Sequence, residues 1–139
     1  MKFQPDRLEG VNSISRHDNG VVWVLAERHD TSVLVPWRGA VRPWPVARFE
    51  QLAATHFEQL LALEPELVIF GSGARLRFVA PALTRPLIER RIGIETMDTA
   101  AACRTYTVLA NEGRSVVAAL LLEGAAAGPG ALTTGAEAL

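Results

Sequence analysis

Leu67-Val68-Ile69-Phe70-Gly71-Ser72-Gly73, residues 67–73, is the stretch that decides the fold of this chain. Four consecutive apolar residues followed by glycines are typical of a short strand that is buried on both faces of a sheet. Two further strands are predicted, at residues 94–97 and at residues 116–122, and the second of these is wholly apolar. We expect all three segments to lie in one sheet, with the first two strands parallel.

Two helices are predicted between these strands. The first runs over residues 84–91, with Thr84 as its N-cap residue and Gly93 as its stop. The second begins at Asp98-Thr99, continues through Ala110 and ends in the turn residues 111–113. Alternating strands and helices of this kind form a mainly parallel sheet with right-handed crossovers, so the fold class is α/β.

The first forty residues predict a meander of three strands, at residues 11–16, 21–25 and 32–35. The first two are joined by His17-Asp18-Asn19-Gly20, whose Asn-Gly pair is a strong hairpin signal. The polar residues Glu27 to Asp30 are predicted as the second turn. The first half of the chain therefore adds a hairpin-rich layer, and the fold is predicted as α/β with a mixed sheet.

Residues 36–45 contain three prolines together with Trp37 and Trp44, which predicts irregular chain over one edge of the core. We favour the two tryptophans as a lid over the sheet, and an exposed aromatic patch that binds a partner is the alternative. From Ala47 onward, apolar residues recur at three- and four-residue steps and predict one helix that ends before Pro65.

Length and composition indicate one domain. The chain has 139 residues, of which 49% are hydrophobic, and this is enough to form a core. Residues 1–123 are predicted to form a single α/β domain. Residues 124–139, rich in alanine and glycine, are predicted to form a disordered tail.

Charge and cysteine content exclude several classes of function. Fourteen basic residues are balanced by fifteen acidic ones, which argues against a protein that neutralises nucleic-acid phosphates. No apolar run approaches the roughly 20 residues of a membrane span, and no secretory signal is visible. Cys103 is the only cysteine, so an internal disulfide is impossible and a cytoplasmic location is predicted. The oligomeric state is not indicated.

A series of short motifs in fixed order resembles a known family. The motifs are Glu64-Pro65-Glu66-Leu67, Gly71-Ser72-Gly73, Gly93-Ile94, Met97-Asp98-Thr99, Ala102-Cys103-Arg104-Thr105-Tyr106 and Glu112-Gly113-Arg114-Ser115-Val116. The resemblance is to the family of small uncharacterised α/β proteins that includes human NADH:ubiquinone oxidoreductase complex assembly factor 3 and the adipogenesis-associated domain-containing protein.

This resemblance covers roughly the last two thirds of the chain and implies a three-layer α/β domain with a mixed central sheet. That family usually has Gly-Thr-Gly where this chain has Ser72, and Tyr-Asn where it has Tyr106-Thr107. The resemblance implies no established catalytic residue and no cofactor.

The best candidate for a site is the pair of loops that follow the strands at 67–70 and 94–97. Open α/β sheets bind ligands at the carboxyl ends of their strands. Glycines allow close approach to the backbone, a helix start offers free N–H groups, and arginines supply positive charge for an anion. The candidate ligand-binding residues are Gly71, Ser72, Gly73, Arg75, Asp98, Thr99 and Arg104. The alternative interpretation is that the same residues only form a turn and cap a helix.

Neither a catalytic constellation nor a metal site is visible in the sequence. Ser72 lies directly between two glycines and lacks the spacing of a nucleophile elbow, and the three histidines are scattered. Cys103 is interpreted as a small buried side chain on a helix, with a reactive thiolate as the alternative. Tyr106 is expected to anchor its helix through a hydroxyl hydrogen bond, and Arg114 to pair with Glu112 or Asp98.

Two functions therefore stay open. The first is a non-catalytic binding or assembly-type domain that recognises a protein partner or a small anionic ligand. The second is a small enzyme that acts on an anionic metabolite at loops 71–75 and 97–99, with Asp98 as acid or base. The enzyme requires a pocket lined by Ser72, Asp98 and an arginine, with Asp98 free of a capping bond.

Overall fold

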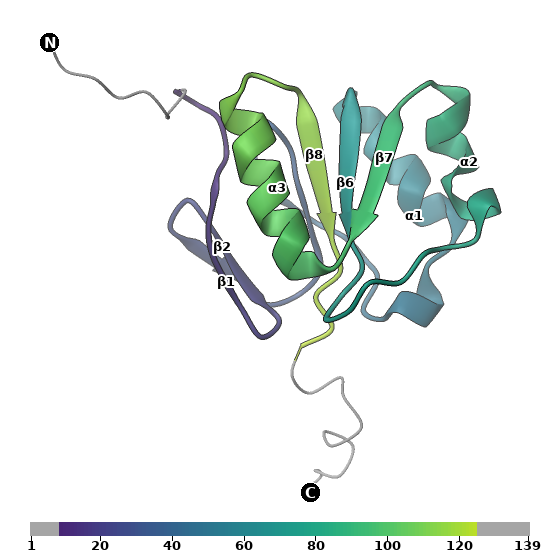
Figure 1. The fold of residues 1–139 in the computed structure, drawn as a ribbon, viewed down its shortest axis with the longest axis horizontal. Helices are drawn as coiled ribbons and strands as arrows, with labels where there is room; N and C mark the ends of the chain where they lie inside the picture. The colour runs from purple at the N-terminus through teal and green to yellow at the C-terminus, as the bar shows by residue number, and fades with distance from the viewer. Residues whose placement is uncertain (1–8, 125–139) are drawn as a thin grey trace, which may run out of the picture.

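A mixed five-stranded sheet forms the centre of the computed structural model, which describes residues 9–124 (Figure 1). Its strand order is β5-β4-β8-β6-β7. The strands are β4 (Val33–Val35), β5 (Arg42–Pro43), β6 (Leu67–Gly71), β7 (Gly93–Met97) and β8 (Val116–Leu120). β6 pairs in parallel with both β7 and β8, whereas β4 is antiparallel to β8 and β5. The predicted sheet and its parallel pair are confirmed.

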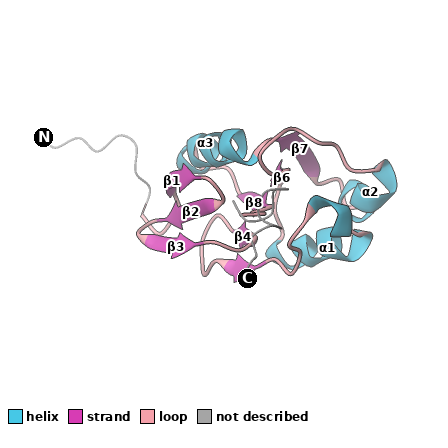
Figure 2. Cartoon of the chain, turned by 90° about the horizontal axis from the view of Figure 1, so that it is seen from below, coloured by secondary structure: helices cyan, strands magenta, loops and turns pink. Residues whose placement is uncertain are grey.

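The side chains of the central strands alternate between two hydrophobic cores. Ile69 and Ala118 face one core, whereas Val68, Phe70 and Val117 face the other. The first face is covered by α3 (Thr99–Asn111) and by a separate meander, and the second by α1 (Ala54–Glu58) and α2 (Pro81–Glu89) (Figure 2). The fold therefore has three layers, and its central strands are apolar throughout because both of their faces are covered.

The meander consists of β1 (Ile14–Asp18), β2 (Val21–Val24) and β3 (Glu27–His29). Asn19 and Gly20, with φ of 45° and 87°, form the predicted hairpin turn between β1 and β2.

The third strand of this meander was predicted wrongly. Residues 27–29 of the turn predicted at 27–30 pair with β2 as a strand, whereas residues 33–35 of the third strand predicted at 32–35 join the central sheet beside β8. The chain reverses instead near Leu25, whose φ is 56°. β3 is a polar edge strand with mostly exposed side chains, so its sequence lacks the apolar alternation of a half-buried strand.

The helix predicted from residue 47 to residue 64 is in fact divided into three short helices. These are η1 (Phe49–Gln51), α1 and η2 (Gln59–Leu63). Leu52 and Ala53 are extended, with ψ of 137° and 168°, and they separate η1 from α1. Phe57 and Leu60 are fully buried, so the apolar face that suggested one helix survives across the break.

The tryptophans cover the core as a lid, in agreement with the favoured prediction. Trp44 is 2% exposed, its ring contacts Phe57 and Phe70 edge-on, and its indole N–H donates to the carbonyl oxygen of His56 at 3.0 Å. Trp37 is partly buried, and its indole N–H donates to the carbonyl oxygen of Ala110 at 3.0 Å. Within the segment predicted as irregular, Arg42 and Pro43 form a two-residue strand.

The start of α2 also differs from the prediction. The helix begins at Pro81 after Ala80, and Thr84 lies inside it with its hydroxyl donating to the carbonyl oxygen of Pro81 at 3.2 Å. Proline is favoured in the first turn because it lacks only an N–H that has no helical partner there. Gly93 is not the stop of this helix but the first residue of β7, and Arg91 takes the left-handed conformation after the helix.

The predicted cap of α3 is confirmed. Asp98 is the N-cap residue, its side chain accepts a hydrogen bond from the N–H of Ala101 at 2.9 Å, and the turn after the helix contains Gly113 with φ of 88°. In the part of the chain that the structure describes, no helix is both long and apolar enough to cross a bilayer. Residues 125–139, nearly all of the predicted tail, lie outside the described residues, so their disorder stays a prediction.

Two glycines in neighbouring strands should respond differently to a methyl group. A Cβ on Gly71 would lie 2.9 Å from Thr99 Oγ1 and 3.0 Å from Thr99 Cα, whereas one on Gly93 would meet only the end of the Leu67 side chain at 3.1 Å. We expect Gly71→Ala to lower the free energy of unfolding by about 1–3 kcal/mol through overpacking against α3. Gly93→Ala should change it by less than about 1 kcal/mol. Urea denaturation measures both, and equal losses would contradict this close packing of β6 on α3.

Candidate functional site

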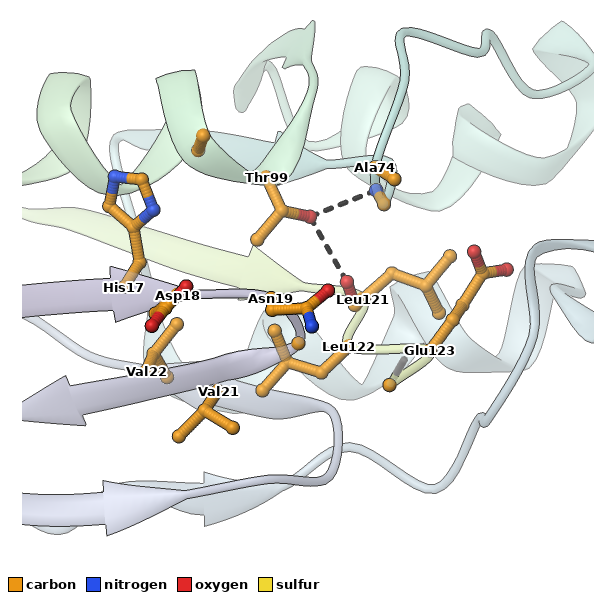
Figure 3. Close-up of a pocket in the computed structure, with 14 residues that line it drawn as sticks. His17, Asp18, Asn19, Val21, Val22, Ala74, Thr99, Leu121, Leu122 and Glu123 are labelled. Atoms are coloured by element: carbon orange, nitrogen blue, oxygen red, sulfur yellow. Dashed lines mark hydrogen bonds between the residues drawn. The ribbon is translucent and has the colours of Figure 1, made fainter. Parts of the chain in front are cut away.

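The hydroxyl of Thr99 joins three segments at the carboxyl ends of the parallel strands. It accepts a hydrogen bond from the N–H of Gly73 at 2.9 Å and donates to the carbonyl oxygen of Leu121 at 3.0 Å (Figure 3). The N–H of Thr99 in turn donates to the carbonyl oxygen of Gly73 at 2.8 Å. The first residue of α3 thereby fixes the loop after β6 and the chain that leaves β8.

Ser72 is fully buried and serves the same loop. Its hydroxyl lies 2.7 Å from the carbonyl oxygen of Arg75 and 3.2 Å from that of Met97, and it accepts from the N–H of Arg77 at 3.0 Å. The N–H of Ser72 donates to Met97 at 2.8 Å. None of these partners is a general base, so the contacts of Ser72 are those of a residue that shapes a turn.

An ion pair between Arg77 and Glu123 closes the loop from the other side. Arg77 Nη2 donates to Glu123 Oε1 and also to the carbonyl oxygen of Ser72, at 2.8 and 2.7 Å. Glu123 Oε2 accepts from the N–H of Phe49 at 2.8 Å, and the guanidinium lies 4.5 Å from the centre of the Phe49 ring. The two side chains are 17% and 19% exposed, so this charge-assisted contact is shielded from most of the solvent.

A cavity of about 410 Å³ lies between the β1–β2 hairpin and the start of α3 (Figure 3). It is lined by hairpin residues 17–22 and by residues 73–74, 99–100 and 121–124. Val21, Val22, Leu121 and Leu122 give it apolar walls, and the carboxylates of Asp18 and Glu123 lie among its lining residues. The cavity is therefore lined mainly by apolar side chains, and of its two carboxylates Glu123 is already paired with Arg77.

The structure brings four of the seven candidate ligand-binding residues together and leaves both arginines outside the cavity. Gly73 and Thr99 line the cavity, and Gly71 and Ser72 lie buried beside them. Asp98 caps α3. Arg75 and Arg104 are exposed; neither lines the cavity, and Arg104 borders a separate hollow beside Ile14 and Cys103.

Sequence reasoning missed the residues that complete this edge. Residues 17–20 were predicted as a turn, but His17 and Asp18 end β1 and only Asn19 and Gly20 turn the chain. Nothing in the sequence of this hairpin end indicates that it faces the start of α3. Arg77 and Glu123 were also missed. An acidic residue directly after the apolar run 116–122 is a usable signal, because a carboxylate that close to a core requires a partner.

The only thiol of the chain is held in its neutral form. Cys103 is 1% exposed, and burial raises the pKa of its thiol to about 12, although the nearby Arg104 guanidinium acts in the opposite direction. This is the environment of an unreactive packing cysteine. Burial also raises the pKa of Tyr106, whose hydroxyl donates to the carbonyl oxygen of Pro36 at 2.6 Å, as the predicted anchoring role requires.

Arg114 and Glu66 form a further ion pair at the other end of the parallel strands. Arg114 pairs with Glu66 at 3.0 Å rather than with the predicted Glu112 or Asp98, because β8 places it beside the start of β6. The Arg114 guanidinium and the N–H of Ser115 hold the pKa of Glu66 below its usual value. Among residues 9–124, no three His, Cys, Asp or Glu side chains gather as metal ligands would.

These elements define the class of protein: a three-layer α/β domain with a mixed five-stranded sheet and an antiparallel meander against one face. Over residues 14–121 the chain matches the family described as protein of unknown function (DUF498/DUF598), and it belongs to that family. The family resemblance drawn from the sequence motifs is thereby confirmed.

A crystal structure of a protein from Bordetella parapertussis is similar, with a TM-score of 0.78 and 35% identity, covering 84% of this chain and 99% of the other. An uncharacterised protein of Rhodobacter capsulatus is 38% identical over 112 residues, which are 81% of this chain and 86% of that protein. NADH dehydrogenase [ubiquinone] 1 alpha subcomplex assembly factor 3 of Bos taurus is 35% identical over 84 residues, 59% of this chain and 46% of the relative. The chain thus matches about half the length of the relatives that bear this name.

Asp98 offers a direct test of whether its carboxylate does more than cap a helix. Asparagine is as good an N-cap as aspartate, so Asp98→Asn should lower the free energy of unfolding by well under about 1 kcal/mol. Asp98→Ala removes the acceptor for Ala101 and should cost about 1 kcal/mol. Chemical denaturation of both variants gives the comparison. A loss with asparagine as large as that with alanine would show that the charge itself holds the loop.

The buried thiol predicts a pH dependence. Because the pKa of Cys103 is raised from 9.0 to about 12 in the folded protein, the unfolded chain releases the thiol proton first as the pH rises. The contribution of Cys103 to stability is therefore complete below pH 9 and falls above it, by at most about 1.4 kcal/mol per pH unit. We expect Cys103→Ala to flatten the decline of the unfolding free energy above pH 9. The same slope in both proteins would contradict the raised pKa.

Proposed function

We propose that this protein is a non-catalytic binding domain of the assembly type, which recognises a protein partner at the carboxyl-end edge of its parallel strands. The observation that carries the proposal is the loop between β6 and α2. There Leu76 is 51% exposed and Phe78 is 71% exposed. In Figure 1 the chain after β6 crosses below the carboxyl end of β7 on its way to α2.

The local structure supports a recognition role for this loop. Exposed aromatic side chains such as Phe78 are enriched at protein interfaces, and the neighbouring Leu76 adds apolar area to the same segment. Ser72 and Arg77 hold the base of the loop through hydrogen bonds at 2.7–3.0 Å. A loop that is already shaped loses less conformational entropy on binding, which favours affinity.

The state of the candidate catalytic groups favours binding over an enzyme. The Ser72 hydroxyl is buried in turn contacts, the Asp98 carboxylate is occupied by its cap, and the Cys103 thiol is neutral. Glu123 at the cavity is already paired with Arg77, and the other carboxylate there, Asp18, repels an anion, which favours a protein partner over a small anionic ligand.

The names of the relatives support an assembly role. Several matching proteins are called NADH dehydrogenase [ubiquinone] 1 alpha subcomplex assembly factor 3. We therefore propose that the partner is a subunit of a multi-subunit complex that is being assembled. A cytoplasmic location, which the single cysteine favours, belongs to the same proposal.

Site-specific photo-crosslinking tests the proposal. A photoreactive phenylalanine analogue replaces Phe78 in cells of the source organism, and the matched control places it at Val108, which is 56% exposed on α3. Neither side chain is buried, so both proteins should fold. We expect irradiation to give discrete protein adducts from position 78, identified by mass spectrometry, and none from position 108. Adducts from both positions alike, or from neither, would count against a partner at this loop.

A further inference from the structure

The central sheet has two edges that differ in their capacity to pair. At one edge, β5 has only two residues, and one of them is Pro43, which lacks an N–H. Short strands and prolines are devices that prevent an edge from pairing. At the other edge, β7 has five residues without proline and pairs only with β6 among the described strands (Figure 1). The β7 edge is therefore the open one.

Two hydrogen bonds show which backbone groups of β7 point away from the sheet. The N–H of Gly93 donates to the carbonyl oxygen of Glu66, and the carbonyl oxygen of Met97 accepts from the N–H of Ser72. In a parallel ladder, alternate residues direct both of their backbone groups to the same neighbour. Residues 93, 95 and 97 therefore face β6, and Ile94 and Thr96 direct their N–H and C=O groups outward.

No backbone hydrogen bond outside the ladder reaches Ile94 or Thr96 from the rest of residues 9–124. The edge thus presents two donors and two acceptors in the spacing of a strand. Between them, Glu95 is exposed, on the same face of the strand as Met97, which packs against the core beneath α3. Ile94, by contrast, packs against the core on the α1 and α2 side.

We propose that β7 receives an extended segment of another protein as a sixth strand, with a lysine or arginine of that segment opposite Glu95. The inference rests on the proposed protein-binding function and specifies how the partner is held. Main-chain hydrogen bonds to Ile94 and Thr96 supply affinity, as in other cases of strand addition. The charge of Glu95 supplies selectivity, because opposite charges across a strand pair stabilise it and like charges destabilise it.

Charge also decides against a second copy of this chain as the occupant. An antiparallel β7–β7 pair that used all four outward groups of each copy would align Ile94 with Thr96 and place Glu95 directly opposite Glu95. Side chains at such non-hydrogen-bonded positions are the closest pairs of an antiparallel ladder. Two carboxylates there repel each other, whereas a basic residue from a different protein is attracted.

Hydrogen exchange on the unmodified protein provides the first test. In the free protein, the amides of Ile94 and Thr96 should exchange fast, whereas the amide of Glu95, which donates within the ladder, should exchange slowly. The probe is a set of short peptides selected for binding from a random displayed library. We expect the selected peptides to be rich in β-branched residues with one basic residue, and to slow exchange at Ile94 and Thr96. Amides at these two positions that are already protected in the free protein, or that stay fast with saturating peptide, would overturn the proposal.

Two variants test the same contact by affinity, measured as fluorescence anisotropy of a labelled selected peptide. Glu95→Lys leaves the backbone intact and should weaken binding by about fivefold to tenfold. Thr96→Pro removes an outward donor and should abolish binding, while Glu95→Pro, which breaks a ladder bond, serves as the structural contrast because it should destabilise the fold far more. Full affinity in both Glu95→Lys and Thr96→Pro would overturn the proposal.

The peptide experiments at β7 and the cross-linking at position 78 test two separate claims. Adducts at position 78 without peptide capture at β7 would overturn strand addition and leave the binding function standing. Peptide capture at β7 without adducts at position 78 would support strand addition and overturn the role of the loop.

Discussion

The hydroxyl of Thr99 is the contact on which the strand-end side of this domain depends. One oxygen joins the loop after β6, the first turn of α3 and the chain after β8. A serine or threonine hydroxyl can donate once and accept as well, so a single side chain satisfies groups from two segments that are distant in sequence. Such close approach leaves no room for a side chain at position 71, where a Cβ would lie 2.9 Å from the same oxygen. The glycine that ends β6 is thus a packing requirement.

The sequence predicted the parts of the fold that depend on burial on both faces. β6 and β8 appear as apolar runs because they lie in the middle of the sheet, and the cap at Asp98 follows from local chemistry alone. β3 was missed because a polar strand at the edge of a small exposed sheet leaves no apolar pattern. The break at Leu52-Ala53 was missed because the helical spacing of apolar residues continues across it.

The candidate site could be predicted only in part, for a related reason. Gly73 and Thr99 belong to the loops that every parallel strand order brings to one edge, and they do line the cavity. Which arginine of the loop reaches the site depends on the path of that loop. Arg77 contacts Glu123, whereas Arg75 is exposed. That path is set by Ser72, whose hydroxyl contacts the backbone of Arg75 and Arg77 within the loop and of Met97 at the end of β7. The contribution of the hairpin tip depends on the docking of one layer on another, which local patterns do not encode.

The position of β8 between β4 and β6 has a consequence for folding during synthesis. β4 is the fourth strand along the described chain and β8 the last, yet the two strands pair directly. In this pair, Leu34 lies opposite Ala119. Until residues 116–120 have left the ribosome, the sheet consists of two halves with no strand to join them, one with β4 and β5 and the other with β6 and β7. Pairing at such long sequence separation is slow because a large loop must close first. The nascent chain therefore carries two apolar half-sheets that are prone to aggregation until β8 emerges.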